Sequence, residues 1–307
     1  MPGFITHYLG GQAMVAQLPA PMQRLINNRA QIFTLGAQGP DIFFYYLPGL
    51  LRKRSRGVGE DIHKSRFGHF FTHMARQLRE EPRPARQKAM FAYLSGMLAH
   101  YALDAYTHPF VYAHTARIDS SRLCEMADHR HFETAVDVLM LARLTGTRPA
   151  DWQRWQLIAA TSSHKRAAAA VLGAAIRAVY NRVIYDHEIF AAMGYMVLGT
   201  KLLQSQHGKR KRILARLEDA TLGARLLSGM VHMEEVTDGR DYLNLACTPW
   251  HAPNASLATR CCFPELFAGA TQDAAGMVQY LYAYMRGDVS RTVLMARVGN
   301  RSLLTGI

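Results

Sequence analysis

The chain has 307 residues, of which 49% are hydrophobic, so it can bury a large core as one big domain or two ordinary ones. No segment approaches about 18 uninterrupted apolar residues, which excludes a membrane-spanning helix. The formal net charge of +13 would attract anions such as phospholipid headgroups, phosphate esters or nucleic acid, although a solvated basic face unrelated to the substrate is the alternative.

The first residues, Met1 to His7, lack the charged region and apolar stretch of a signal peptide. The four cysteines have no zinc-finger spacing, and a disulfide between the adjacent Cys261 and Cys262 would be strained. We therefore expect free thiols in a cytoplasmic protein.

The hydrophobic pattern is helical almost throughout and never alternates as in a sheet. The stretch 85–107 is apolar on most faces, which predicts a buried central helix. Because Pro109 would clash with the carbonyl of Ala105, we expect that helix to bend or end near His108. In chain order, the predicted helices span residues 11–27, 28–36, 61–81, 85–107, 121–144, 151–183, 187–206 and 262–287.

These elements predict an all-α fold. We expect a single multi-helix domain over 1–307, since no repeat or low-complexity linker divides the chain. Within it, the first 145 residues carry a metal-site core and residues 146–307 form a helical remainder. The stretch 238–261 is less regular.

Five potential metal ligands lie within 34 residues: His100, Asp104, His108, His129 and Glu133. Read as helix, the first three follow one another at four-residue steps, which keeps their side chains within about 80° on one face. The last two lie one turn apart in the same way. Imidazole nitrogen and carboxylate oxygen are ligands for zinc and similar divalent metals. The spacing therefore indicates a metal centre built on two facing helices.

The alternative is a buried histidine–aspartate pair that shares a hydrogen bond without a metal. Asp104 lies inside an otherwise apolar helix, where an unpaired carboxylate would be costly. A metal ion would remove that cost.

Other residues strengthen or extend the candidate site. Asp41 follows a Gly-Pro turn, where an aspartate is otherwise a helix cap. His63 opens the next helix and His7 lies near the start of the chain. His69 and His73 lie at a four-residue step and are further candidates, although they lack an identifiable partner helix. His131 lies two residues from both His129 and Glu133, so we expect it to point away from them. Four isolated histidines are interpreted as structural: His164, His187, His207 and His232.

In this order, these residues resemble the zinc-dependent phospholipase C family, which is related to bacterial phosphatidylcholine-hydrolysing phospholipases C and to P1-type nucleases. The H-x3-D-x3-H and H-x3-E elements occur in the family's order. The matching pieces are residues 4–7, 36–45, His63, 98–104, 107–109, His129 with Glu133, 242–245 and 248–250.

The resemblance implies an all-α fold around a buried multinuclear zinc site. One zinc would be held by Asp41, His63, His100 and Asp104, and a second by His108, His129 and Glu133. Asp104 would bridge to a third zinc, which His7 also binds. Secreted relatives complete that third site with their mature N-terminal residue, whereas this chain begins Met-Pro, so we expect two or three Zn2+ ions.

The implied function is phosphodiester hydrolysis, most directly the phospholipase C-type cleavage of phospholipid by zinc-activated water, with Asp41 as the residue that orients or deprotonates the water. Single-strand nuclease or other phosphoesterase activity is one alternative, and a non-catalytic helical metal-binding or scaffold protein is another. The aromatic run 43–46 would line the pocket or belong to the core. The basic clusters Arg52–Arg56 and Lys209–Arg212 would contact an anionic membrane surface such as the inner leaflet. The oligomeric state stays open.

Overall fold

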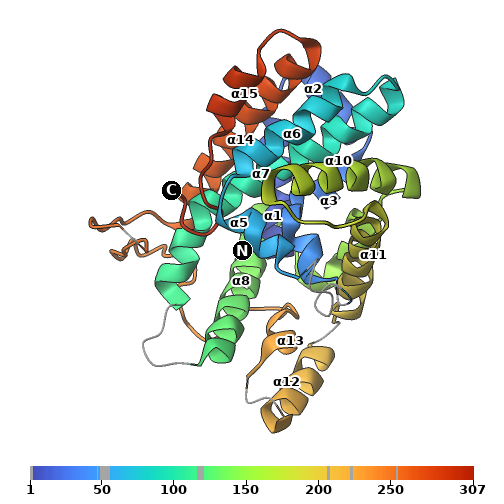
Figure 1. Cartoon of the computed structure of the whole chain (residues 1–307). Coiled ribbons are helices and arrows are strands. Elements are labelled where there is room, and N and C mark those ends of the chain that lie inside the picture. The colour runs from blue at the N-terminus through green and yellow to red at the C-terminus, as the bar shows by residue number, and fades with distance from the viewer. Residues whose placement is uncertain are drawn as a thin grey trace.

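The computed structural model describes residues 3–46, 48, 56–115, 121–205, 208–221, 224–253 and 255–307. Within these ranges the chain is mostly helical, with a long irregular stretch between Gly229 and Phe263, and its only β-type pairing is a single antiparallel bridge between Trp250 and Thr259. The all-α prediction is confirmed (Figure 1). The predictions on Met1, Pro2, residues 52–55 and His207 lie outside the described residues.

The helices pack around one long central helix, which lies in the middle of the chain order (Figure 1). Those before it are α1 (Phe4–Ala16), α2 (Ala20–Asn27), α3 (Ala30–Ala37), the 3-10 turn η1 (Gly39–Phe44), α5 (Val58–Lys64) and α6 (Phe67–Glu80). The central helix is α7 (Pro84–Thr115). It is followed by α8 (Arg122–Thr145), η2 (Pro149–Asp151), α9 (Arg154–Leu157), α10 (Ser162–Tyr180), α11 (Asp186–Leu202), α12 (Lys209–Thr221), α13 (Leu226–Gly229), α14 (Phe263–Arg286) and α15 (Arg291–Val298).

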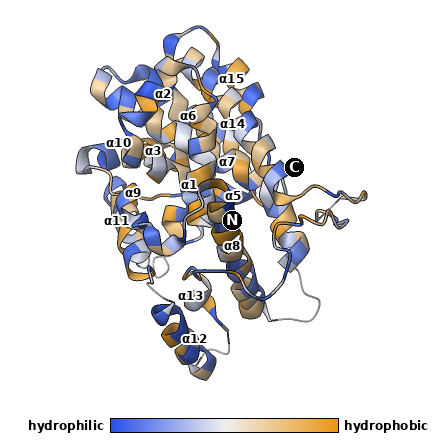
Figure 2. Cartoon of the chain, turned by 180° about the vertical axis from the view of Figure 1, so that it is seen from behind, coloured by the Kyte–Doolittle hydropathy of each residue, from blue (hydrophilic) through white to orange (hydrophobic). Residues whose placement is uncertain are grey.

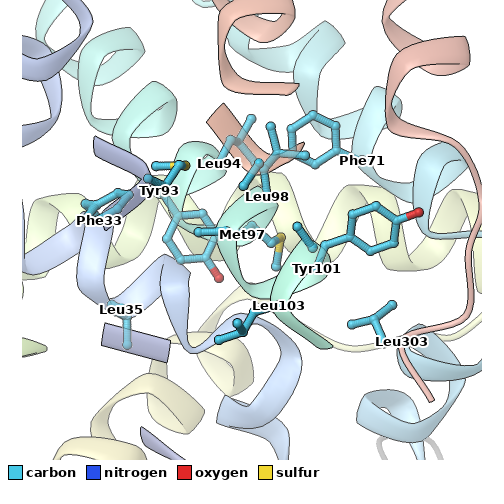
Figure 3. Packing of buried hydrophobic residues seen from close by; sticks show 14 of the residues in the cluster. Phe33, Leu35, Phe71, Tyr93, Leu94, Met97, Leu98, Tyr101, Leu103 and Leu303 are labelled. Carbon is cyan, nitrogen blue, oxygen red and sulfur yellow. The ribbon is translucent and has the colours of Figure 1, made fainter. Parts of the chain in front are cut away.

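Helix α7 is buried along most of its length because other helices pack around it, above all α3 and α14. Its large side chains form the centre of the core (Figure 3). Helix α3 comes unusually close: a Cβ at Gly36 would lie 2.1 Å from the carbonyl oxygen of Tyr93, and one at Gly96 would lie 2.2 Å from that of Phe33. This close approach holds η1, which follows α3, against the middle of α7.

The expected end of the central helix near His108 is wrong, since α7 continues through Pro109 to Thr115. Proline removes one backbone hydrogen bond and favours a helix break. Here the residues beyond it, Phe110 and Val111, are fully buried, so packing compensates for the lost bond.

Other predicted boundaries also shift. The segment 11–27 contains parts of two helices. The first, α1, already begins at Phe4, and the second, α2, begins directly after Pro19. The segment 61–81 is interrupted at Arg66, whose φ of 63° ends α5 and starts α6. In 151–183 the long helix begins only after Thr161, whose side chain caps α10 by accepting a hydrogen bond from the backbone N–H of His164.

Two further expectations can be compared with the structure. The four cysteines are free thiols, as predicted. None of the helices in the described ranges has the length and apolar character that crossing a membrane requires. The cytoplasmic location stays a prediction.

Candidate metal centre

Five elements bring the predicted ligands together. Helix α1 carries His7, η1 carries Asp41 and α5 carries His63, while α7 and α8 carry the remaining five candidates. Figure 1 shows α1, α5 and α8 gathered beside the second half of α7. The candidates on α1, η1, α5 and α7 are buried, and the two on α8 are half-buried.

Asp104 lies at the centre of the group. Its Oδ2 is 3.1 Å from the Nε2 atom of His100 and 3.6 Å from that of His63. Its Oδ1 is 3.3 Å from Nε2 of His7, whose ring stacks on His100 with centroids 4.2 Å apart. The two carboxylate oxygens therefore face different histidines.

Asp41 adds a second carboxylate to the same group. Its Oδ1 lies 3.3 Å from Nε2 of His63 and 3.9 Å from Nε2 of His100. The η1 turn can approach α7 this closely because it starts with glycine: Gly39 has a φ of +52°, and a Cβ there would lie 2.3 Å from the His100 ring.

A second group joins α7 to α8. Ligand atoms of His108, His129 and Glu133 all lie within 4.8 Å of one another. Nε2 of His129 is 2.8 Å from Oε1 of Glu133, one helical turn away. The two groups are neighbours, since Nδ1 of His108 is 3.9 Å from Oδ2 of Asp104.

Backbone carbonyls orient three of the histidines. Nδ1 of His63 donates to the Gly59 carbonyl at 2.7 Å, and Nδ1 of His100 donates to that of Ala37 at 3.2 Å. Nδ1 of His108 donates to the carbonyl of Leu303. Because a carbonyl oxygen only accepts, each Nδ1 must carry a hydrogen, and in the neutral ring each Nε2 has a lone pair.

These lone pairs meet other polar atoms that lack partners. Among the described residues, the following buried atoms accept or donate no hydrogen bond: Nδ1 and Nε2 of His7, Oδ1 of Asp41, Nε2 of His63, His100 and His108, and both carboxylate oxygens of Asp104. The His100–Asp104 contact at 3.1 Å is an ion pair, so the metal-free pair that the spacing allowed stays an alternative to the metal site. So many orphaned atoms would be costly without a ligand. Imidazole and carboxylate donors in this number fit zinc.

The protonation states also suit metal binding, which needs neutral imidazoles and ionised carboxylates. Burial lowers the pKa of His7 and of His108. Although burial acts in the opposite sense, the rings of His100 and His108 hold the pKa of Asp104 well below its usual range. Against the effect of burial, the neighbouring His129 helps lower the pKa of Glu133 to about 2. His100 differs, because the carboxylates of Asp104 and Asp41 outweigh burial and raise its pKa.

Sequence reasoning missed two residues that support the site. Leu303 is fully buried near Tyr101 (Figure 3), and its backbone contacts ligand residues of both groups. Besides accepting from His108, it donates its N–H to the carbonyl of His63 at 2.9 Å. These are backbone contacts, which leave no signature in residue types.

The second missed residue is Asp137 on α8, which caps α1 one turn before His7. Its carboxylate accepts hydrogen bonds from Ile5 N–H at 2.9 Å, and from the N–H and hydroxyl of Thr6 at 2.7 and 2.6 Å. Nε2 of His232 lies 2.6 Å from the same carboxylate, and Nδ1 of His232 contacts the guanidinium of Arg154. The interpretation of His232 as structural agrees with this network.

Other histidines lie apart from the centre. His131 points toward Tyr242, with its Nε2 3.3 Å from the hydroxyl. His69 and His73 belong to none of the three-residue groups that could hold a metal within the described ranges. They line a surface pocket with Arg66 and Arg291 instead.

The chain is an all-α bundle in which separate helices contribute clusters of histidine and carboxylate side chains. This combination is typical of helical metalloproteins that bind metal ions at adjacent positions. The comparison with protein families is more specific. A family described as zinc dependent phospholipase C matches residues 6–188, which is more than half of the chain and includes all eight candidate ligands. The chain belongs to this zinc-dependent phospholipase C family. No curated protein and no solved structure matches it significantly.

Proposed function

We propose that this chain is a phosphodiester hydrolase that cleaves phospholipid in the manner of a phospholipase C. Family membership supports the reaction class. The observation that carries the proposal for this chain is the convergence of unpartnered, buried ligand atoms around Asp104.

We assign the metal ligands in three sets. Asp41, His63, His100 and Asp104 would hold one zinc, His108, His129 and Glu133 a second, and Asp104 with His7 would contribute to a third. The distances around each carboxylate support the first two sets directly. Zinc bound there would supply Lewis acidity, which makes water a competent nucleophile near neutral pH and neutralises charge on the phosphate.

We assign Asp41 the role of orienting the attacking water and accepting its proton. The first set contains two carboxylates. The side chain of Asp41 is 9% exposed and that of Asp104 is wholly buried, so Asp41 is the carboxylate that solvent can contact. Water would form the new bond to phosphorus as the ester bond to the alcohol breaks. The water would give one proton to the Asp41 carboxylate, the departing alkoxide would take a proton from solvent, and Asp41 would then release its own proton to solvent.

The direct test is to remove single ligands and to measure zinc content and hydrolysis together. We expect Asp104→Asn and His100→Ala to lose bound zinc and to lower phosphodiesterase activity by about a thousandfold or more, because each removes a ligand from a shared site. Asp186→Asn and His187→Ala change exposed residues of α11 and should behave as the native protein. Full activity with unchanged zinc in either ligand variant would contradict the proposal.

A substrate panel separates phospholipase from the related reactions. Phosphatidylcholine, bis-p-nitrophenyl phosphate and single-stranded DNA would each be offered to the zinc-loaded protein. We expect hydrolysis of phospholipid to be the fastest, with diacylglycerol as a product. Preferential cleavage of DNA would replace this function by that of a nuclease, and no hydrolysis of any substrate would indicate a binding protein.

A further inference from the structure

Helix α12, beyond the region matched by the family, turns charged side chains inward. Nζ of Lys211 donates to the carbonyls of Ser228 at 3.0 Å and Val231 at 2.7 Å. The buried carboxylate of Glu218 accepts the N–H groups of Leu227 at 2.5 Å and of Ser228 at 3.0 Å. Polar contacts therefore help to hold α12 on the segment that contains α13.

The opposite face of α12 carries exposed aliphatic side chains. Ile213 and Leu217 are 58% and 57% exposed, and their four-residue step places them on one face. Exposed Arg212 and Arg216 flank them. An ordinary surface helix buries its apolar side chains and exposes its charges. Helix α12 departs from this pattern, because it exposes Ile213 and Leu217 among its charged residues and turns Lys211 and Glu218 inward.

The end of α11 also exposes aliphatic side chains. Leu198 and Leu202 lie one turn apart and are 51% and 62% exposed. The guanidinium of Arg210, in the first turn of α12, donates to the carbonyls of Leu202 and Gln204, both at 2.9 Å. The exposed leucine at the end of α11 is thus tied to the basic start of α12.

The position and charge of α12 suit a membrane surface. Figure 1 shows α12 at the edge of the molecule, and Figure 2 shows hydrophobic and hydrophilic residues side by side on it. Its basic residues are Lys209, Arg210, Lys211, Arg212 and Arg216, while its exposed acidic residue, Asp219, is paired with Arg225 at 2.8 Å. Exposed aliphatic side chains among lysine and arginine are typical of helices that lie in the interface of anionic membranes.

Contacts also link α12 to the candidate metal centre. Helix α13, on which α12 packs, is bound to α8: the hydroxyl of Thr134 donates to the Gly229 carbonyl at 3.1 Å, and Arg130 donates to the Leu226 carbonyl at 3.1 Å. Thr134 directly follows Glu133. Helix α12 is therefore connected through α13 to the helix that carries two candidate ligands.

We propose that the exposed face of α12, with the adjoining end of α11, docks onto an anionic phospholipid bilayer with Ile213 and Leu217 inserted among the lipids. The inference rests on the proposed function in one respect: docking would bring phospholipid substrate to the candidate metal centre. The basic cluster Lys209–Arg212 would attract the bilayer, and the aliphatic residues would hold it.

The test measures sedimentation with vesicles of phosphatidylcholine, with and without phosphatidylserine, in the presence of a chelator so that no lipid is hydrolysed. We expect the native protein to bind the anionic vesicles and to be largely released by high salt. The double variant Ile213→Ser, Leu217→Ser should lose about tenfold in binding. The matched control, Leu144→Ser with Val293→Ser, changes residues of similar exposure (50% and 43%) away from α12 and should bind as the native protein.

Equal vesicle binding by the Ile213/Leu217 variant and the native protein would overturn the inference, as would binding to single-stranded DNA in place of vesicles. Hydrolysis of soluble bis-p-nitrophenyl phosphate, measured separately, should be unchanged in this variant. If Asp104→Asn binds vesicles but the native protein hydrolyses nothing, the proposed function fails while the docking surface stands. If the native protein hydrolyses phospholipid but the Ile213/Leu217 variant binds vesicles as well as the native protein does, the docking surface fails while the proposed function stands.

Discussion

At the scale of single residues, the carboxylate of Asp104 lies where burial would be costly without a ligand. It is wholly buried, and among the described residues neither of its oxygens has a hydrogen-bond partner. An isolated buried carboxylate would be protonated. The surrounding His100, His108 and His7 instead favour its ionised form, which is the form that a metal requires.

His232 provides a test of the support behind α1. Burial, aided by the charge of Arg154, lowers its pKa from 6.5 to about 4, so the folded protein keeps this ring neutral. Between these pH values the unfolded chain binds a proton that the folded chain does not. The free energy of unfolding should therefore fall as the pH decreases from 6.5 to 4, by up to about 3 kcal/mol from this group.

Denaturant unfolding of metal-free protein at several pH values would measure this contribution. The variant His232→Gln lacks the titrating ring, so its stability should fall less steeply over the same window. His187→Gln, which changes an exposed histidine, should retain the native slope. Identical slopes for the native protein and His232→Gln would show that the ring does not stay neutral in the folded state.

At the scale of elements, the metal centre depends on how a few helices approach one another. Gly36 and Gly96 allow α3 to touch α7, and this contact places η1 with Asp41 beside His100. The segment after α15 closes the other side through the backbone of Leu303. Each of these contacts lies between residues more than 50 positions apart.

Removing residues 302–307 should weaken zinc binding, because the carbonyl that orients His108 and the N–H that binds the His63 carbonyl are both lost. We expect zinc affinity to fall by about tenfold to a hundredfold, as for other outer-sphere contacts. Titration with a chromophoric zinc chelator would measure the change, and circular dichroism would report whether the helices persist. Ile307→Ala, which leaves both contacts in place, is the control. A truncated protein that is folded and binds zinc as tightly as the native chain would contradict this role.

At the scale of the whole molecule, zinc and folding should be coupled. The candidate ligands come from α1, η1, α5, α7 and α8, so bound zinc would join elements that span the first half of the chain. A ligand that binds only the folded state raises stability.

We therefore expect removal of zinc by a chelator to lower the unfolding temperature by about 5–10 °C, as followed by differential scanning fluorimetry. Adding zinc back should restore it. Asp104→Asn, which lacks the shared ligand, should respond much less to the chelator. An unfolding temperature that is the same with and without zinc would argue against a metal that bridges these elements.

The all-α fold and five of the candidate ligands could be predicted from local spacing in the sequence, whereas His7, Asp41 and His63 were assigned as ligands by the family resemblance. Helical periodicity marks α3, α8 and α14 closely, and four-residue steps mark His100, Asp104 and His108. Helix ends were less predictable: α7 runs through Pro109 because its continuation is buried, and burial depends on neighbours distant in the chain.

The sequence by itself determined the helical class and the residue types and order of the candidate ligands, since these follow from side-chain chemistry and from the 3.6-residue helical period. Tertiary structure alone decided which nitrogen of each histidine faces the centre, that Leu303 and Asp137 support it, and that α12 exposes its aliphatic face. Those features arise from contacts between distant segments and from burial, and neither is encoded in local spacing.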